Sequence, residues 1–361
     1  MKGTARDITS EKSEYYEYVF KRILVLVLFL AVLIIIAVFS LTIGGRDISF
    51  VQAAESIWNH LTGNLPVADT KAWWDDYSVW NIRLPRVLVA IIAGASLALG
   101  GAAMQPAVKN PLADPYTTGI SSGAVFGVAV GLVMGFTIST SIGHYGLIVN
   151  AFVFGLVPAL IIAAMSKMTG SSPATIILTG VAISYLFQAM STLLLISTDA
   201  ETLQQAYTWQ IGTLQNVVWD DVPIMFAFTL VGGILIMLCS SKLNILTLGD
   251  ESARSLGLSA ENFRILLLIL ISLMTASVVA FIGIIGFIGL VSPHIIRMLL
   301  GSNNRYVVPA SALIGALMIL IADLIARTII YPGEIAVGVV MSFIGAPIFL
   351  ILIIHTKKAA W

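Results

Sequence analysis

This chain carries little charge for its length. Of its 361 residues only 11% are charged, whereas soluble domains carry about 25% charged residues. Hydrophobic residues make up 58%, and the mean hydropathy is +0.97. So few charges cannot cover a water-exposed surface, which excludes a soluble globular fold and predicts a membrane protein. The formal net charge is zero, so no nucleic-acid partner is expected.

The sequence also lacks the residue patterns of covalent and metal chemistry. Its single cysteine, Cys239, excludes an intramolecular disulfide. Neither the zinc pattern H-E-x-x-H nor the P-loop G-x-x-x-x-G-K-[ST] occurs. We therefore expect no enzyme activity, no cofactor and no metal site, and an ATP-driven role would require a separate subunit. An intramembrane enzyme would need paired acids or a zinc site, and the sequence shows neither.

Long uncharged runs are abundant, and each is a candidate transmembrane helix. A helix needs about 20 apolar residues to cross the hydrocarbon core. Ten helices are predicted, at 23–43, 87–108, two within 115–166, 168–198, 222–241, two within 265–296, 306–326 and 335–356. A polar break near 139–144 divides the third run. Gly283, Gly286 and Gly289 interrupt 265–296, where we expect a full helix followed by a shorter one.

The basic residues predict the orientation, because Lys and Arg collect in cytoplasmic segments. With both termini cytoplasmic, most of the 19 Lys and Arg lie inside. The exceptions are Arg46, Lys71, Arg83, Arg86 and Arg327. The chain then divides into a cytoplasmic N-terminal segment (1–22), a membrane-spanning domain (23–356) and a cytoplasmic tail (357–361). The first apolar run is expected to be a retained helix, not a cleaved signal peptide.

Two longer connections stand out in this topology. The outer loop, 44–82, is rich in tryptophan and is expected to form a partly interfacial cap. The inner loop, 242–261, is expected to hold two short helices at the membrane surface. One covers 250–256, with Gly257 as its C-terminal stop and Ser259 capping the next helix. Leu248, Ala253 and Leu256 would give this loop an apolar edge.

Several motifs, in order, resemble the FecCD family, the permeases of iron-siderophore, haem and vitamin B12 importers. They are R-L-P-R at 83–86, N-P-L-A-D-P at 110–115, L-G-D-E-S-A-R-S-L-G at 248–257, G-F-I-G-L-V-S-P-H at 286–294, A-D-L-I-A-R at 322–327 and G-A-P at 345–347. The resemblance covers roughly 80–355. It implies an all-α, BtuC-like bundle that works as a homodimer in the cytoplasmic membrane. Its implied partners are ATP-binding-cassette ATPase subunits and an extracytoplasmic substrate-binding protein.

The resemblance also assigns roles at the inner side. It implies that the inner loop docks into the ATPase through Leu248, Gly249, Asp250, Glu251, Ala253, Arg254, Leu256 and Gly257. From the residues alone, a solvated connector is an equal alternative. It further implies that Ser171, Ser172 and Pro173 form the inner gate of the pore, although these residues also suit a simple tight turn.

The other basic and polar candidates each have two possible roles. Arg83 and Arg86 lie where cations oppose a helix dipole, at a cost of about 0.3–1 kcal/mol each. The resemblance implies that they and Arg327 dock the binding protein. Lipid-phosphate anchoring remains open for the first two, and an ion pair with Asp323, four residues earlier, for Arg327. A stripe of Ser184, Gln188 and Ser191 either lines the pore or makes interhelical hydrogen bonds.

The resemblance therefore implies the permease subunit of an ATP-driven importer. We expect an iron(III) chelate as cargo because that cargo class is the commonest in the family. Vitamin B12 or haem is the alternative cargo for the same architecture. An ion-coupled secondary transporter is the alternative from another class. Such transporters place carboxylates or broken helices at the midplane in repeated halves, whereas Asp323 is the one clear intramembrane acid and no inverted repeat is evident.

Overall fold

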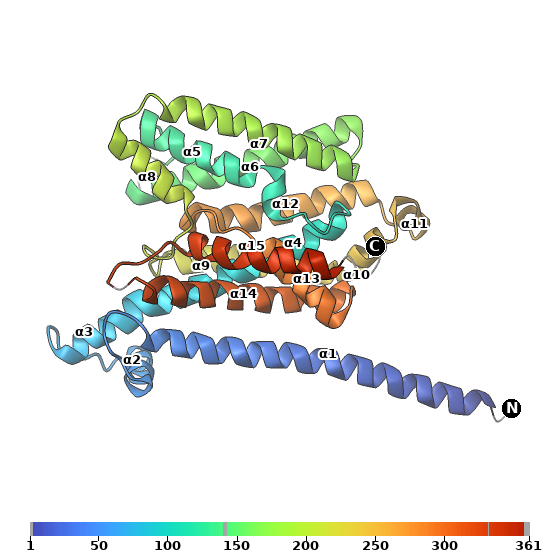
Figure 1. Ribbon diagram of the computed structural model, residues 1–361, viewed down its shortest axis with the longest axis horizontal. Coiled ribbons are helices and arrows are strands. Elements are labelled where there is room, and N and C mark those ends of the chain that lie inside the picture. Colours follow the sequence, from blue (N-terminus) through green and yellow to red (C-terminus); the bar gives the residue numbers. More distant parts are fainter. Residues whose placement is uncertain (1–2, 140–142, 331, 357–361) are drawn as a thin grey trace.

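The computed structural model describes residues 3–139, 143–330 and 332–356, and these are almost entirely helical (Figure 1). The elements are α1 (Gly3–Thr42), α2 (Phe50–Thr62), α3 (Lys71–Tyr77), a π-helical turn η1 (Ser78–Arg83), α4 (Leu84–Ala107), a 3-10 turn η2 (Pro115–Thr118), α5 (Ile120–Met134), α6 (Gly143–Thr169), α7 (Pro173–Leu195), α8 (Ala200–Gln210), α9 (Asp221–Leu238), α10 (Ser240–Thr247), α11 (Asp250–Ser255), α12 (Ala260–Ile282), α13 (Ile288–Leu300), α14 (Asn304–Thr328) and α15 (Val337–Thr356). A single isolated bridge, Ile211 to Ile284, is the β-type pairing found in this part of the chain.

Within the described ranges, seven helices are long and apolar enough to cross a membrane, and three apolar helices are shorter. The seven are Glu14–Thr42, Lys71–Ala107, Tyr145–Thr169, Pro173–Leu195, Asp221–Leu238, Ala260–Ile282 and Asn304–Thr328; the shorter three are Ile120–Met134, Ile288–Leu300 and Val337–Leu352. The predicted all-helical membrane fold is confirmed, and each predicted run coincides with one of these helices. The count of ten crossings and the side of each terminus stay predictions. The polar break falls partly, and the tail 357–361 wholly, outside the described residues.

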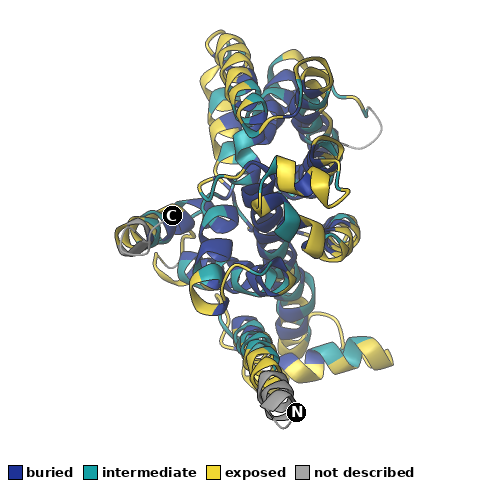
Figure 2. Ribbon diagram, turned by 90° about the vertical axis from the view of Figure 1, so that its right-hand side faces the viewer, coloured by how far each residue is buried: buried dark blue, intermediate teal, exposed yellow. Residues whose placement is uncertain are grey.

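Helix α4 occupies the centre of the bundle, and most of its side chains are buried (Figure 2). It touches α14 where Gly94 meets Gly315, and α13 where Gly101 meets Gly289. A Cβ atom added to Gly94 would lie 2.2 Å from the Gly315 carbonyl oxygen, and one added to Gly101 would lie 1.8 Å from the Gly289 oxygen. Only glycine permits this approach of two backbones, so Gly94 and Gly101 mark close contacts of α4 with α14 and α13.

A break separates α12 from α13, as the three glycines predicted. Helix α12 ends at Ile282, and Gly283 and Phe287 both have left-handed φ angles, 75° and 70°. The extended segment between them bonds to neighbouring chain segments: the Gly212 N–H donates to the Ile284 oxygen at 3.1 Å, and the Thr213 N–H to the Ile282 oxygen at 2.8 Å. Two carbonyl groups at the break are thus hydrogen-bonded inside the protein, as backbone polar groups in an apolar solvent require.

Most of the outer loop, 44–82, is helical. It contains α2, α3 and η1, and η1 runs directly into α4. The Ser49 side chain accepts from the Gln52 N–H and the Gln52 side chain accepts from the Ser49 N–H, forming a capping box that starts α2. The His60 and Trp80 rings stack at 4.1 Å, and the Trp219 indole N–H donates to the Trp80 oxygen at 2.7 Å. These contacts tie the cap to the bundle.

Helices α5, α6 and α7 form a group of their own on one side of α12 (Figure 1). Gly123 and Gly127 of α5 lie against the α6 backbone, and the buried Asn150 side chain donates to the Gly127 oxygen at 3.1 Å. Helix α7 lies at the periphery, with exposed Tyr185 and Leu193 on its outer face. Helices α5 and α7 of this group, together with α8, line a cavity.

Candidate functional site

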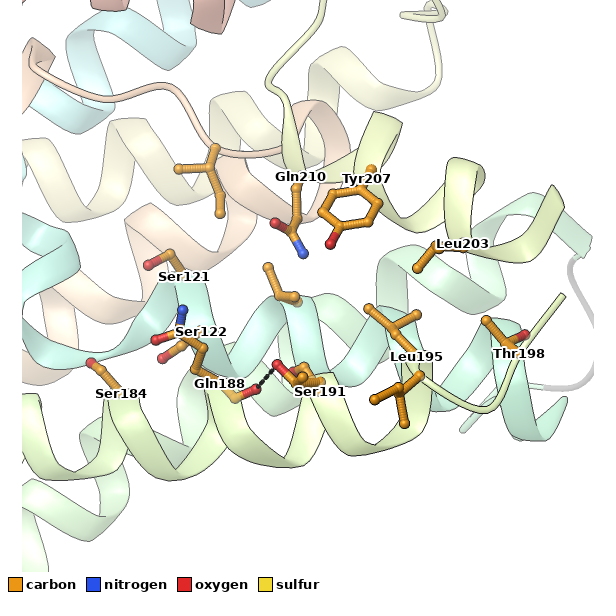
Figure 3. A pocket seen from close by; sticks show the side chains of 14 residues that line it. Ser121, Ser122, Ser184, Gln188, Ser191, Leu195, Thr198, Leu203, Tyr207 and Gln210 are labelled. Carbon is orange, nitrogen blue, oxygen red and sulfur yellow. Dashed lines mark hydrogen bonds between the residues drawn. The ribbon is translucent and has the colours of Figure 1, made fainter. Parts of the chain in front are cut away.

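A cavity of about 670 Å³ lies between α5, α7 and α8 (Figure 3). It is lined by Ser121, Ser122, Val125, Ser184, Gln188, Ser191, Thr192, Leu195, Ile196, Thr198, Leu203, Tyr207, Gln210 and Ile284. The three residues of the predicted polar stripe are all among them. None of the lining residues is an acid, a lysine, an arginine or a histidine, so the wall is uncharged and combines hydroxyl and amide groups with aliphatic side chains.

Hydroxyl groups of the α7 stripe bond within their own helix. Ser184 donates to the Gly180 oxygen at 2.7 Å, and Ser191 donates to the Phe187 oxygen at 2.8 Å. The Ser184 and Ser191 hydroxyls therefore do not donate the interhelical hydrogen bonds that were considered as an alternative. Because each O–H is used inside the helix, its oxygen lone pairs remain as weak acceptors at the cavity wall.

Two further parts of this wall were missed by the sequence reasoning. Ser121 and Ser122 come from the start of α5, and Tyr207 and Gln210 come from α8. A signal existed for α8, whose sequence A-E-T-L-Q-Q-A-Y-T-W-Q is polar between two apolar runs. Gln210 and Ile284 also border a second hollow of about 420 Å³ that reaches α15.

The predicted gate residues form the turn between α6 and α7. Ser172 is exposed and caps α7, because its Oγ accepts from the Thr175 N–H at 3.0 Å. Pro173 occupies the first helical position, where its missing N–H costs nothing. Ser171 is buried. The tight capped turn is thus present, and its role as a gate stays a prediction.

The inner loop has the two predicted short helices, α10 and α11. Helix α11 ends near the predicted residue, and Gly257 follows with φ 78°, as expected for a helix stop. Ser259 takes the N-cap position of α12, but its side chain makes no capping bond, so that detail of the prediction is wrong. Arg254 pairs with Glu261 at 3.0 Å.

The apolar edge of the inner loop is narrower than predicted. Leu248 and Leu256 are 65% and 62% exposed, whereas Ala253 is fully buried. Ala253 therefore belongs to the core and not to the edge, because α11 turns it toward the bundle. Asp250 is held at 2.8 Å by Lys109 and also pairs with Arg264. Hydrogen bonding from Arg264, and then from Lys109, holds the pKa of Asp250 well below its usual range.

At the opposite end, three arginines predicted for docking converge on one pocket. The pocket has a volume of about 350 Å³ and is lined by Gly44, Gly45, Arg46, Trp74, Tyr77, Ser78, Ile82, Arg83, Arg86, Arg327 and Glu334. Arg83, Arg86 and Arg327 are all buried. The first two consequently do not lie on the lipid-facing surface, which disfavours the lipid-phosphate reading.

Most side-chain nitrogens of these three arginines donate hydrogen bonds to other residues of the chain. Arg86 Nε donates to Asp323 Oδ1 at 2.8 Å, and its Nη1 donates to Glu334 Oε2 at 2.8 Å. Arg327 lies 3.0 Å from the other Asp323 oxygen, so the ion pair considered for it exists. Arg83 donates to the Leu41 oxygen at 2.8 Å. The buried Arg86 Nη2 has no hydrogen-bond partner.

Comparison with known proteins identifies the family of this chain. Residues 32–355 match the model of the FecCD transport family. The hemin transport system permease protein of Yersinia pestis is 38% identical over 330 residues, which cover 91% of this chain and 95% of that protein. The cobalamin import system permease protein of Halobacterium salinarum is 37% identical, over 76% of this chain and 73% of that one.

A solved structure of a metal-chelate type ABC transporter in an inward-facing conformation is also similar. Its TM-score is 0.80 at 30% identity, and the match covers 91% of this chain and 98% of that one. The family match spans the central helices, the inner loop and the arginine pocket. The chain therefore belongs to the FecCD transport family, whose members are permease subunits of ABC transporters in the cell membrane.

Proposed function

We propose that this chain, as a pair of identical copies, forms the membrane pathway of an ATP-driven importer for an iron(III) chelate. The observation that carries the cargo proposal is the uncharged wall of the 670 Å³ cavity, in which hydroxyl and amide groups stand beside aliphatic side chains. A bare metal ion would need carboxylate, imidazole or thiolate ligands. Hydroxyls and amides instead make weak hydrogen bonds to a chelate whose metal is already fully ligated, and weak binding permits release on the inner side.

Transport in this proposal proceeds by movement transmitted from a separate ATPase. The exposed Leu248 and Leu256 offer that subunit an apolar contact at the inner surface. Closure of the ATPase pair on ATP moves the inner loop, and the turn at Ser171–Pro173 opens or closes the inner end of the pathway. A substrate-binding protein delivers the chelate at the outer end.

Ion-coupled transport is disfavoured by the state of the one clear intramembrane acid. Asp323 is fully buried and pairs with both Arg86 and Arg327. A carboxylate neutralised by two guanidinium groups is a poor carrier of protons or sodium, because releasing it would leave buried cations unpaired. The lining residues of the cavity include no carboxylate that could take that role.

The cargo proposal is tested with the complete importer, purified with its ATPase and binding protein and placed in vesicles with internal ATP. Ferric citrate, a ferric hydroxamate chelate, haemin and cobalamin are offered at equal concentration. We expect ATP-dependent uptake of an iron(III) chelate. Uptake of haemin or cobalamin alone would replace iron chelate by that cargo, and uptake of free Fe³⁺ without a chelator would contradict the cavity argument.

For the outer pocket we propose that an acidic side chain of the binding protein enters beside Arg86. Four arginines surround the pocket, and Glu334, partly exposed, occupies Arg86 in the absence of a partner. Glu334 and an incoming carboxylate would therefore compete for the same guanidinium. The unused Nη2 donor of Arg86 supports this role.

Replacing Glu334 by glutamine should strengthen docking, because the competing negative charge is removed. We expect the dissociation constant of the binding protein to fall by about two- to fivefold, as for an ion pair worth a few tenths to 1 kcal/mol. Binding to the detergent-purified permease at low salt measures it. Glu201→Gln, an exposed acid on α8, is the control. Unchanged or weaker binding in Glu334→Gln alone would contradict this arrangement.

A further inference from the structure

A fully buried arginine lies between the inner loop and the gate turn. Arg264, in the first turns of α12, has no exposed surface and is among the largest completely buried side chains of the described residues. Its Nε donates to the Ala107 oxygen at 2.7 Å, and its Nη1 donates to the Ser171 oxygen at 3.2 Å. Nη1 and Nη2 together hold the Asp250 carboxylate, with Nη1 at 2.9 Å from Oδ2.

Each of these partners belongs to a different segment of the chain. Ala107 ends α4, the central helix; Ser171 opens the gate turn; and Asp250 begins α11. A guanidinium group is flat and rigid, so its five N–H bonds keep fixed directions relative to one another. A displacement of Asp250 must therefore rotate or shift the whole group, and this changes its bonds to the two carbonyl oxygens.

Good packing alone does not explain why a charged arginine is buried at this position. Placing a charged group in the interior costs several kcal/mol, and an apolar side chain of similar volume is often as stable. The Ala107 oxygen at the end of α4 and the Ser171 oxygen in the turn could both be satisfied by neutral donors. The charge of Arg264 is matched by Asp250, which also pairs with Lys109 and begins the helix that the proposed function places against the ATPase.

We propose that Arg264 is the positioning residue that transmits movement of α11 to the gate turn. This inference rests on the proposed function, because it requires an ATPase that moves the inner loop. The shared Nη1 group carries the link. It bonds Asp250 and Ser171 at once, so when α11 shifts with its carboxylate, the bond to the gate turn is lost or re-formed.

The test follows the gate directly and needs no cargo. Ala174, exposed in the first turn of α7, is replaced by cysteine on a Cys239→Ala background, which leaves the Ser172 cap intact. The chain is purified with its own ATPase, and the rate of maleimide labelling at position 174 is measured without nucleotide and with ATP plus vanadate. We expect the two rates to differ by about fivefold or more, the lower range of allosteric coupling.

In Arg264→Gln the ratio of the two rates should fall to about one, while the ATPase still co-purifies. Arg264→Lys guards against a failure to fold: it keeps the charge beside Asp250 but cannot reach all three partners at once. It should also lose the response. Arg22→Gln is the matched control, because Arg22 donates to the Leu300 oxygen at 2.7 Å but touches neither α11 nor the gate turn.

The outcomes separate this inference from the proposed function. If the wild-type chain carries no ATPase, or its labelling ignores nucleotide, the proposed function fails and the inference with it. If the wild type and Arg22→Gln respond and either Arg264 variant responds equally, Arg264 is not the link and the proposed function stands. Loss of ATPase assembly in both Arg264 variants would show a purely structural role and would also overturn the inference.

Discussion

Two acids share Arg86 but differ in burial. Asp323 has no exposed surface, accepts from Arg86 and forms an ion pair with Arg327, whereas Glu334 keeps 31% of its side chain exposed. Water can therefore compensate for the loss of the Glu334 carboxylate but not for the loss of the Asp323 carboxylate. The two acids provide a direct comparison of a buried pair and a partly exposed one at the same guanidinium.

Asp323→Asn should destabilise the chain by about 3–5 kcal/mol, because it leaves Arg86 and Arg327 buried with less compensating charge. Glu334→Gln should cost about 1 kcal/mol or less, as for partly exposed pairs. Thermal unfolding of the purified chain in detergent measures both. Equal melting temperatures for the two variants would contradict this network of buried charges.

Residues with local signals were predictable from the sequence, and residues placed by tertiary contacts were not. Asp114 lies directly before Pro115, a pattern typical of a helix start, and its carboxylate accepts from the Thr117 N–H at 3.1 Å. Gly257 was expected to stop a helix, and it does. Arg264 looked like one more cytoplasmic cation, because its three partners lie 14 to 157 positions away along the chain.

Helix packing depends on glycines that no larger residue can replace. The Gly101–Gly289 contact holds the α4 and α13 backbones together next to the break before α13. Gly286 lies in that same break, and a Cβ atom added there would meet nothing within 4 Å. Both glycines therefore lie near the break, but only Gly101 is packed against another backbone.

Gly101→Ala should destabilise the bundle by about 1–3 kcal/mol, because the added methyl group meets backbone that cannot move aside. Gly286→Ala should change the stability by less than about 1 kcal/mol. The midpoint of thermal aggregation, followed by size-exclusion chromatography, compares the two variants. A tolerated Gly101→Ala would mean that the backbones of α4 and α13 do not touch at Gly101 and Gly289.

Hydropathy predicted where the helices of the bundle lie, because lipid-compatible segments must be long and apolar. It did not predict α2 and α3. These helices are short, and their ends are set by side-chain caps at Ser49 and Thr70, not by an apolar run. Nor did it predict that α1 extends back to Gly3, since the polar residues before position 23 resemble an ordinary tail.

The whole molecule has a polar cavity, an outer pocket of arginines and an inner loop with an apolar edge, which together suit a permease that works with soluble partners. Family membership was predictable, because its motifs are local and ordered along the chain. The cavity wall was only partly predictable, since α5 and α8 meet α7 through folding and not through sequence spacing. In the proposed function, the cargo is selected by that wall and by the binding protein together.

The most direct test of the importer proposal is to purify the tagged chain in mild detergent from its native cells and to identify what comes with it. We predict a near-equimolar soluble protein carrying a P-loop. It should be lost from Leu248→Ser/Leu256→Ser and retained by Met298→Ser/Leu299→Ser, which alters two other exposed apolar residues. A chain that purifies alone and moves solute in vesicles under an ion gradient would contradict the proposal.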